Sequence, residues 1–296
     1  MKRLLILLAV LAAGGSPALA VSFYFVPDVP TDLGGTTYFP WNVVRNDSGA
    51  YSLALTLPFG THLDALFRMN GGDWLFSVKA PTILGGVSCD PRDVIRFDGT
   101  TYSIFFGGAS AGVPPGANVD AAFLVGGDSG TLVLGFDVPT TIGGTTYDPA
   151  DLVRYSGGAF SLFFDASAVT PTIAVQSNAT GAVLSDGRTI LSFDIPTTLG
   201  GVTYFPGQLV AWTVAGFSLL YGDPAWRVSS RINALAFLPD PGEVPLLTVS
   251  PISPAQVRLN WTASCSAGGE DYGIYQGTIG SWYSHTLVVC HDGGTP

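Results

Sequence analysis

The sequence has few of the side chains that enzymes most often use for proton transfer. It contains three histidines, and Glu243 and Glu270 are its only glutamates, so acid–base chemistry would depend almost entirely on aspartate. His62 is the only histidine before the C-terminal region, and the linker in which it lies contains no serine motif of the nucleophile-elbow type. The sequence therefore contains no recognisable catalytic constellation.

Charge is also scarce, and most of it is negative. Charged residues make up 11% of the chain, against about 25% in an average soluble domain. Twelve basic residues face 22 acidic ones. Nucleic acids and anionic lipid surfaces require clusters of Lys and Arg, so neither is expected as a partner.

Long hydrophobic runs are absent, which argues against insertion into a membrane. The longest apolar run, Leu4 to Ala13, is shorter than the roughly 20 residues that span a bilayer. It follows Lys2 and Arg3 and precedes Ala18-Leu19-Ala20, the pattern of a cleavable export signal. We expect residues 1–20 to be a signal peptide of a secreted, extracellular or periplasmic bacterial protein. An N-terminal membrane anchor is the alternative.

Helical periodicity is missing after the signal, whereas glycine and proline are abundant at 38 and 21 residues. Short alternating segments recur, such as Tyr102 to Phe106, and alternation of this kind predicts β-strands. The mature chain is therefore expected to be all-β.

One segment occurs four times in register. The copies are anchored by the pairs Gly34-Gly35, Gly85-Gly86, Gly143-Gly144 and Gly200-Gly201. The same offsets superpose prolines, apolar residues and serines, the last being Ser52, Ser103, Ser161 and Ser218. Paired glycines supply the positive φ angles of tight turns, and each repeat of about 57 residues divides into four short strands. Four antiparallel strands per repeat are typical of a propeller blade.

The phase of the repeats predicts a closed ring. The mature chain begins at the second strand of a repeat, from Ser22 to Val29, and a lone opening strand follows the fourth copy, from Ile232 to Phe237. Pairing these two segments would complete the first blade and remove open sheet edges. We therefore predict a monomeric four-bladed β-propeller over residues 21–240, closed by a C-terminal strand. A linear β array or two packed sandwiches is the alternative.

The amino-acid sequence of the repeats resembles that of one group of exported proteins. Residues 148–155, DPADLVRY, and residues 160–165, FSLFFD, resemble repeats of uncharacterised exported bacterial proteins. This resemblance covers residues 21 to about 240 and implies export and repetition only.

Residues 241–296 differ in pattern and follow a proline-rich break. The segments 257–261 and 271–275 resemble the second and third strands of a fibronectin type III domain. About 50 residues remain where such a sandwich takes about 100. We expect a partial fibronectin-like segment, either because the sequence is a fragment or because another chain completes it.

Two of the three cysteines, Cys265 and Cys290, lie in this tail, and in an exported protein we expect them to form a disulfide. Zinc binding together with His285 and His291 is the alternative. Cys89 takes the place of tyrosines in the other repeats and is expected to be a buried apolar substitute.

Three polar residues of the opening strands suggest a site on the propeller axis. Asp64, Asp120 and Asn233 occupy the second position of these strands, which we expect to line the channel. Converging oxygens suit a structural calcium ion or ordered water. The alternative is hydrogen bonding to the backbone of neighbouring blades. A second set, Asp28, Asp137 and Asp194, is interrupted by Lys79 and is expected to make a poor symmetric site.

Aromatic residues in loops give the remaining indication of function. Trp41 and Trp226, with Phe39 and Phe205, lie in predicted loops where they could stack on sugars or pack between blades. We expect a non-catalytic binding or scaffold module for an extracellular glycan, protein or matrix ligand. A polysaccharide hydrolase or lyase using aspartates at the channel mouth is the alternative.

Overall fold

The structure is a computed structural model that describes residues 22–47, 49–169, 171–173, 179–183, 187–223, 226, 230–237, 247–253, 256–261, 274–276 and 286–289. Every regular element in these ranges is a β-strand. Within the same ranges no helix is long and apolar enough to cross a membrane. The prediction of an all-β chain is confirmed for the described residues.

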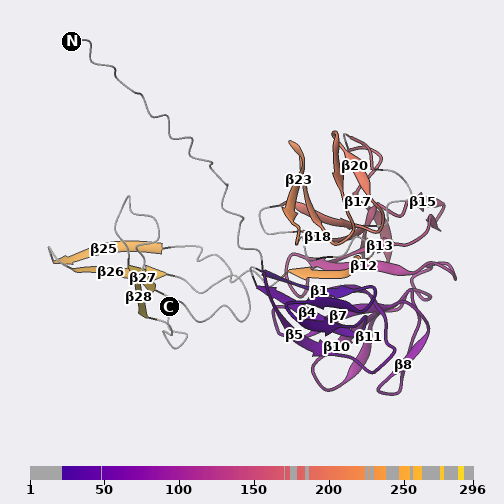
Figure 1. Cartoon of the computed structure of the whole chain (residues 1–296), viewed down its shortest axis with the longest axis horizontal. Coiled ribbons are helices and arrows are strands. Elements are labelled where there is room, and N and C mark those ends of the chain that lie inside the picture. The colour runs from indigo at the N-terminus through magenta and orange to yellow at the C-terminus, as the bar shows by residue number, and fades with distance from the viewer. Residues whose placement is uncertain are drawn as a thin grey trace, which may run out of the picture.

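Four antiparallel sheets of four strands form the main body of the molecule (Figure 1). From the axis outward, the first consists of β24 (Ile232–Phe237), β1 (Ser22–Pro27), β4 (Asn42–Asp47) and β5 (Ala50–Thr56). The second consists of β6 (Leu63–Arg68), β7 (Trp74–Val78), β10 (Val94–Phe97) and β11 (Tyr102–Phe106). The third consists of β12 (Val119–Val125), β13 (Thr131–Phe136), β16 (Leu152–Ser156) and β17 (Ala159–Phe164). The fourth consists of β18 (Ala179–Val183), β19 (Thr189–Phe193), β22 (Leu209–Thr213) and β23 (Gly216–Tyr221).

The last repeat strand closes the ring. β24 pairs antiparallel with β1, with Phe23 opposite Phe237 and Val26 opposite Ala234, and the orange strand lies beside indigo β1 in Figure 1. The innermost strands contact one another in turn, β24 with β6, β6 with β12, β12 with β18, and β18 with β24. The four sheets are therefore blades of a propeller, and the predicted closure is confirmed.

A polar contact between the outer parts of blades 1 and 4 reinforces this closure. The Tyr51 hydroxyl from β5 lies 2.5 Å from that of Tyr221 in β23 and donates to the Asp223 carboxylate. Burial, helped by these partners, raises the pKa of Tyr51, and burial raises that of Tyr221 to about 12. Both phenols therefore stay protonated at physiological pH and can act as donors.

The core is divided among the four interfaces between blades. Because successive residues of a strand point to opposite faces, each inner strand contributes to two interfaces. On β24, Ala234 and Ala236 pack toward blade 2, whereas Leu235 packs toward blade 4. β12 divides in the same way, with Val119 and Leu124 on one side and Phe123 on the other. Burial on both faces is possible only when a blade stands on each side.

Each blade carries a small hairpin between its second and third strands. The hairpins are β2–β3 (Thr31–Leu33, Thr36–Tyr38), β8–β9 (Thr82–Leu84, Val87–Cys89), β14–β15 (Thr140–Ile142, Thr145–Tyr147) and β20–β21 (Thr197–Leu199, Val202–Tyr204). Their turns are the repeated glycine pairs; Gly85 and Gly86 have φ angles of 57° and 88°, which favour glycine. Cys89 is buried within such a hairpin, as predicted.

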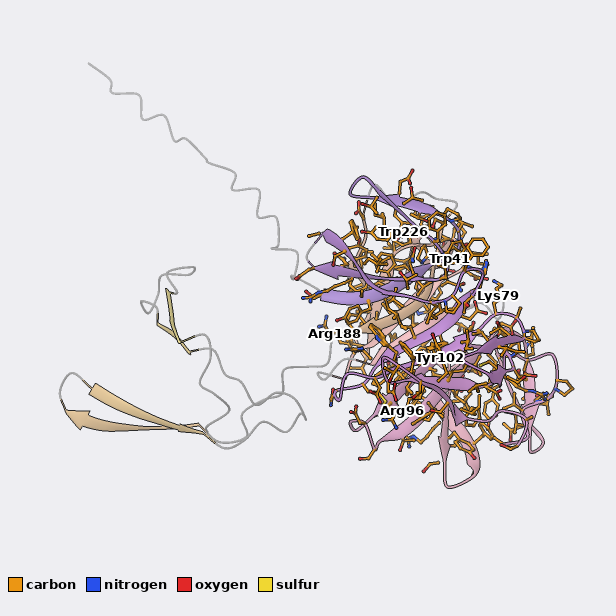
Figure 2. The ribbon with its side chains drawn as sticks, turned by 90° about the horizontal axis from the view of Figure 1, so that it is seen from below. Trp41, Lys79, Arg96, Tyr102, Arg188 and Trp226 are labelled. Atoms are coloured by element: carbon orange, nitrogen blue, oxygen red, sulfur yellow. The ribbon has the colours of Figure 1, made fainter. Side chains whose placement is uncertain are left out.

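The antiparallel order sends all long connections to one end of the propeller, here called the loop face. It carries the four hairpins and the links between blades, whereas the opposite end has the turns within strand pairs. Lys79, just after β7, and Arg188, just before β19, lie toward opposite sides of the propeller in Figure 2. Any site built from loops should therefore lie on the loop face.

Two further sets of side chains recur in the repeats. The outermost strands exist, but the apolar residue after each repeated serine is exposed, namely Leu53, Ile104, Leu162 and Leu219. These strands are the blade edges, so one of their faces has no neighbour to pack against. The repeated aspartates Asp93 and Asp151 accept backbone N–H groups, from Asp90 and Gly108 and from Asp148 and Ala166, and thus stabilise loops.

The tail contains two strand pairs, β25–β26 (Leu247–Ser253, Gln256–Trp261) and β27–β28 (Ile274–Gln276, Thr286–Val289). β26 covers the first of the two segments that resemble fibronectin type III strands, and β27 overlaps the end of the second. Much of the remaining tail lies outside the described residues, and the fibronectin-like sandwich stays a prediction.

Because closure depends on β24, truncating a buried side chain there should weaken the whole ring. We expect Leu235→Ala to lower the free energy of unfolding by about 2–5 kcal/mol, the usual cost of a cavity in a core. The matched control is Val214→Ala, at a 99% exposed turn position, which should change it by less than about 0.5 kcal/mol. Urea unfolding monitored by tryptophan fluorescence measures both. Equal stability of the two variants would contradict the closed ring.

Candidate functional site: a polar cavity on the propeller axis

A polar cavity of about 250 Å³ opens at the loop-face end of the innermost strands. It is lined by Asp64, Lys79, Asn118, Asp120, Asp137, Ser192, Asp194, Arg231, Ile232 and Asn233. Ile232 is the single apolar residue in this set. The cavity therefore suits a polar ligand or water and not a hydrophobic molecule.

The three residues predicted to share an axial site do lie around this cavity. The Asn233 side-chain nitrogen donates to one Asp64 carboxylate oxygen at 2.5 Å and also to the Leu63 carbonyl oxygen of blade 2. The Asn118 side-chain nitrogen donates to the other Asp64 oxygen. Asp64 is thus held between amides from two neighbouring blades, and Asp120 lines the same cavity.

Asp137 stands opposite Asn118 at the end of the β12–β13 pair. Its Oδ1 accepts the Asn118 backbone N–H at 2.9 Å, and its own backbone N–H donates to the Asn118 carbonyl oxygen. Burial raises the pKa of this carboxyl, and the nearby Asp64 charge adds to the rise, while Lys79 and the hydrogen bonds oppose it. A carboxyl with a raised pKa in a polar cavity is typical of functional sites.

Three residues of the second set of repeated positions, Lys79, Asp137 and Asp194, line the cavity, and the fourth, Asp28, contacts the lining residue Arg231. The Arg231 guanidinium lies 3.6 Å from both the Asp28 and the Asp194 carboxylates. Lys79 occupies the position that is aspartate in the other three repeats, and it is exposed at the mouth. Both cations therefore face the acidic positions of this ring.

The sequence predicts a site at one of the two sets of lining residues but not at the other. It groups Asp64, Asp120 and Asn233 but not Asp137 and Asp194, because Lys79 breaks the symmetry. Strand order could have recovered them, since the start of each opening strand and the end of the next strand lie at the same end of a blade. Asn118 and Arg231 share one repeat position, two residues before Asp120 and Asn233, and Ser192 aligns with Ser77, so comparison of the repeats also held a signal for these residues.

A metal at this place remains a prediction. Among the described residues, no three His, Cys, Asp or Glu side chains converge closely enough to hold an ion. The amide donors on Asp64 offer another way to offset its charge. The predicted calcium site at Asp64 and Asp120 is therefore tested by experiment below.

Trp226 packs between blades, which is one of the two roles that the sequence left open for it. It is only 7% exposed, its ring packs against Phe25, and its indole N–H donates to the Ser230 carbonyl oxygen at 2.7 Å. A Cβ at position 207 would overlap the Trp226 ring, so Gly207 makes room for it. Trp226 is therefore part of the core between blades 4 and 1.

Trp41 instead belongs to an aromatic cluster on the loop face (Figure 2). Its ring stacks on Phe39 at 4.8 Å between centroids and an interplanar angle of 8°. Phe59 packs edge-on against it at 4.8 Å and 61°, and Phe59 is 88% exposed. Phe59 was missed because nothing in its local sequence separates it from an ordinary loop residue.

The predicted disulfide partners Cys265 and Cys290, like His285 and His291, lie outside the described residues. Their bridge stays a prediction.

The fold and the cavity define a four-bladed β-propeller with a polar axial site. No protein-family model and no curated protein matches the chain. Among solved structures it is similar to virginiamycin B lyase from Staphylococcus aureus, at 11% identity and a TM-score of 0.29, over 69% of this chain and 57% of that chain. A protein of unknown function from Bacteroides caccae aligns at 10% identity and a TM-score of 0.31, over 68% of this chain and 72% of that chain. Likeness at this level says nothing about what this chain binds.

The raised pKa of Asp137 predicts how stability depends on pH. A carboxyl whose pKa is higher in the folded state contributes stability that is present below about pH 4 and is lost as pH rises through the folded pKa. We therefore expect the stability of the wild type relative to Asp137→Asn to fall as pH increases above 4. Urea titrations across this range measure the difference.

Asp98→Asn is the control for this measurement, because the pKa of Asp98 is shifted in the opposite direction. Hydrogen bonds from Thr101 and Thr100 hold the pKa of Asp98 below its usual range. Relative to Asp98→Asn, the wild type should therefore lose stability as pH falls. Parallel pH dependence in the two variants would contradict both assignments.

Proposed function

We propose that this chain is a secreted, non-catalytic binding module that holds an extracellular glycan against the aromatic cluster Phe39, Trp41 and Phe59. The observation that carries the proposal is the 88% exposed Phe59 ring standing against the Trp41–Phe39 stack. Singly exposed apolar residues are ordinary, but three contacting aromatic rings at a protein surface indicate an interaction site. The export pattern of residues 1–20 supports an extracellular ligand.

The geometry of the cluster fits a sugar better than an apolar ligand. A pyranose ring has one face of C–H groups, which can pack on an aromatic ring, and a rim of hydroxyls that stays in water. The Phe39 and Trp41 rings are parallel, and the Phe59 ring is inclined to them by 61° and is the most exposed of the three. Trp41 is itself partly packed against the core between blades 1 and 2, which fixes the position of the stack.

One observation favours the alternative, a polysaccharide hydrolase or lyase that uses the axial aspartates. The raised pKa of Asp137 is a property of general acids. Such an enzyme also needs a second carboxylate that is free to act as base or nucleophile. Both oxygens of the neighbouring Asp64 carboxylate already accept amide N–H groups, which favours binding over catalysis.

The cluster can be tested with one variant and a matched control. We expect Phe59→Ala to weaken retention by soluble polysaccharides at least tenfold, because stacking area is lost without disturbing the core. Phe205→Ala is the control: Phe205 is 42% exposed at the repeat position of Phe39, but glycine replaces tryptophan beside it. Affinity electrophoresis against cellulose, xylan, mannan and dextran derivatives measures retention, and chromatography of the same polysaccharides detects product release.

Retention that is lost in Phe59→Ala and kept in Phe205→Ala supports the proposal. Equal loss in both variants, or no retention of the wild type by a full glycan array, would refute it. Release of shortened or unsaturated sugars by the wild type would favour the enzyme.

A further inference from the structure

The axial cavity is a second site, independent of the aromatic cluster. The two share no residue, although both lie on the loop face. A ligand could therefore occupy the cavity whether or not the cluster binds a glycan.

The charges around the cavity favour a cation. The described residues that line the cavity include four aspartates, Asp64, Asp120, Asp137 and Asp194, and two cations, Lys79 and Arg231, an excess of two formal negative charges in this set. Arg231 lies between Asp28 and Asp194 at the mouth, so its positive charge offsets these two carboxylates and not those of the interior. The interior therefore attracts a positively charged group.

Two buried acceptors point to a ligand with hydrogen-bond donors. The side-chain oxygen of Asn118, a residue only 8% exposed, has no hydrogen-bond partner among the described residues, and neither has the hydroxyl of Ser192, which is 2% exposed. The orientation of the Asn118 amide is fixed, because its nitrogen must face the Asp64 carboxylate. Buried polar atoms without partners are rare in native proteins, so both atoms call for a donor that the chain itself does not supply.

The arrangement distinguishes among possible cations. A bare metal ion requires several oxygens converging at short range, and no cluster of three acidic or imidazole side chains is formed in the described part of the chain. A quaternary ammonium requires aromatic walls, and no aromatic residue lines the cavity. A guanidinium prefers a free carboxylate fork, but Asp64 has both oxygens engaged.

We propose that the axial cavity binds the primary ammonium group of a small amine. An ammonium has three N–H donors that can point to separate acceptors, which matches the scattered Asn118 and Ser192 oxygens. The rest of the ligand extends through the mouth past Lys79, where a neutral or anionic substituent is favoured over a second positive charge.

Titration of the labelled full chain with ethylammonium, monitored by NMR, tests this directly. The Asn118 and Asn233 side-chain amides, which contact Asp64, should shift in a saturable way in the millimolar range, the strongest affinity expected of so small an ion. Tetramethylammonium has the same charge without a donor and is the matched control probe. Calcium is the third probe.

Two substitutions and one control substitution sharpen the test without opening the core. Ser192→Ala removes a hydroxyl that has no partner, so it should leave unfolding unchanged or slightly more difficult and yet weaken ethylammonium binding by about tenfold. Ser52→Ala, on the exposed outer strand of blade 1, should change neither property. Lys79→Ala should strengthen binding a few-fold, because it removes a like charge at the mouth.

Saturable shifts with ethylammonium, weakened in Ser192→Ala, support the proposal. Equal shifts with tetramethylammonium would show attraction by charge alone and overturn it. Calcium acting at much lower concentration would identify a metal site instead, and no shift at tens of millimolar ethylammonium would mean that the cavity holds only water. These results are independent of polysaccharide retention, so this proposal and the proposed glycan site can fail separately.

Discussion

The pairing of β24 with β1 is the interaction on which the rest of the structure depends. It joins the two ends of the repeat region and places β24 between β18 and β6 on the axis. Without it, β1 would lose its axial neighbour, and blades 2 and 4 would each lose the packing that buries Ala234, Ala236 and Leu235. A ring of four blades has only four interfaces, and β24 contributes to two of them.

The same closure creates the cavity. Asn233 contacts Asp64 of blade 2 because β24 returns to blade 1 and packs beside β6. The same return brings Arg231, which directly precedes β24, into contact with Asp28. The polar residues that differ between repeats, such as Lys79, Asn118 and Ser192, then meet on the axis. The repeated apolar positions thus build the ring, whereas the polar positions around the axis, several of which differ in residue type between repeats, give its centre a chemical character.

The fold was predictable because the sequence features that determine it recur at regular intervals along the chain. The glycine pairs, the strand alternation and the complementary partial repeats at the two ends together imply four blades and a closing strand. Exposure was less predictable. Leu53 looks like a core residue but lies on a blade edge, and Trp226 looks like a loop residue but fills the space that Gly207 leaves open. The exposure of both residues depends on what packs against them from a neighbouring blade, which the local sequence does not specify.

Hydrogen exchange of the backbone amides of β24, followed by mass spectrometry on the intact chain, tests the closed ring most directly. β24 is the axial edge strand of its sheet, and its amides that pair with β1 are enclosed by the neighbouring blades, so they should open only with the global unfolding of the domain. Residues 232–237 should therefore exchange as slowly as β6 and β12, the other strands on the axis. Exchange within seconds, at the rate of an unpaired segment, would contradict the closed ring and with it the axial site.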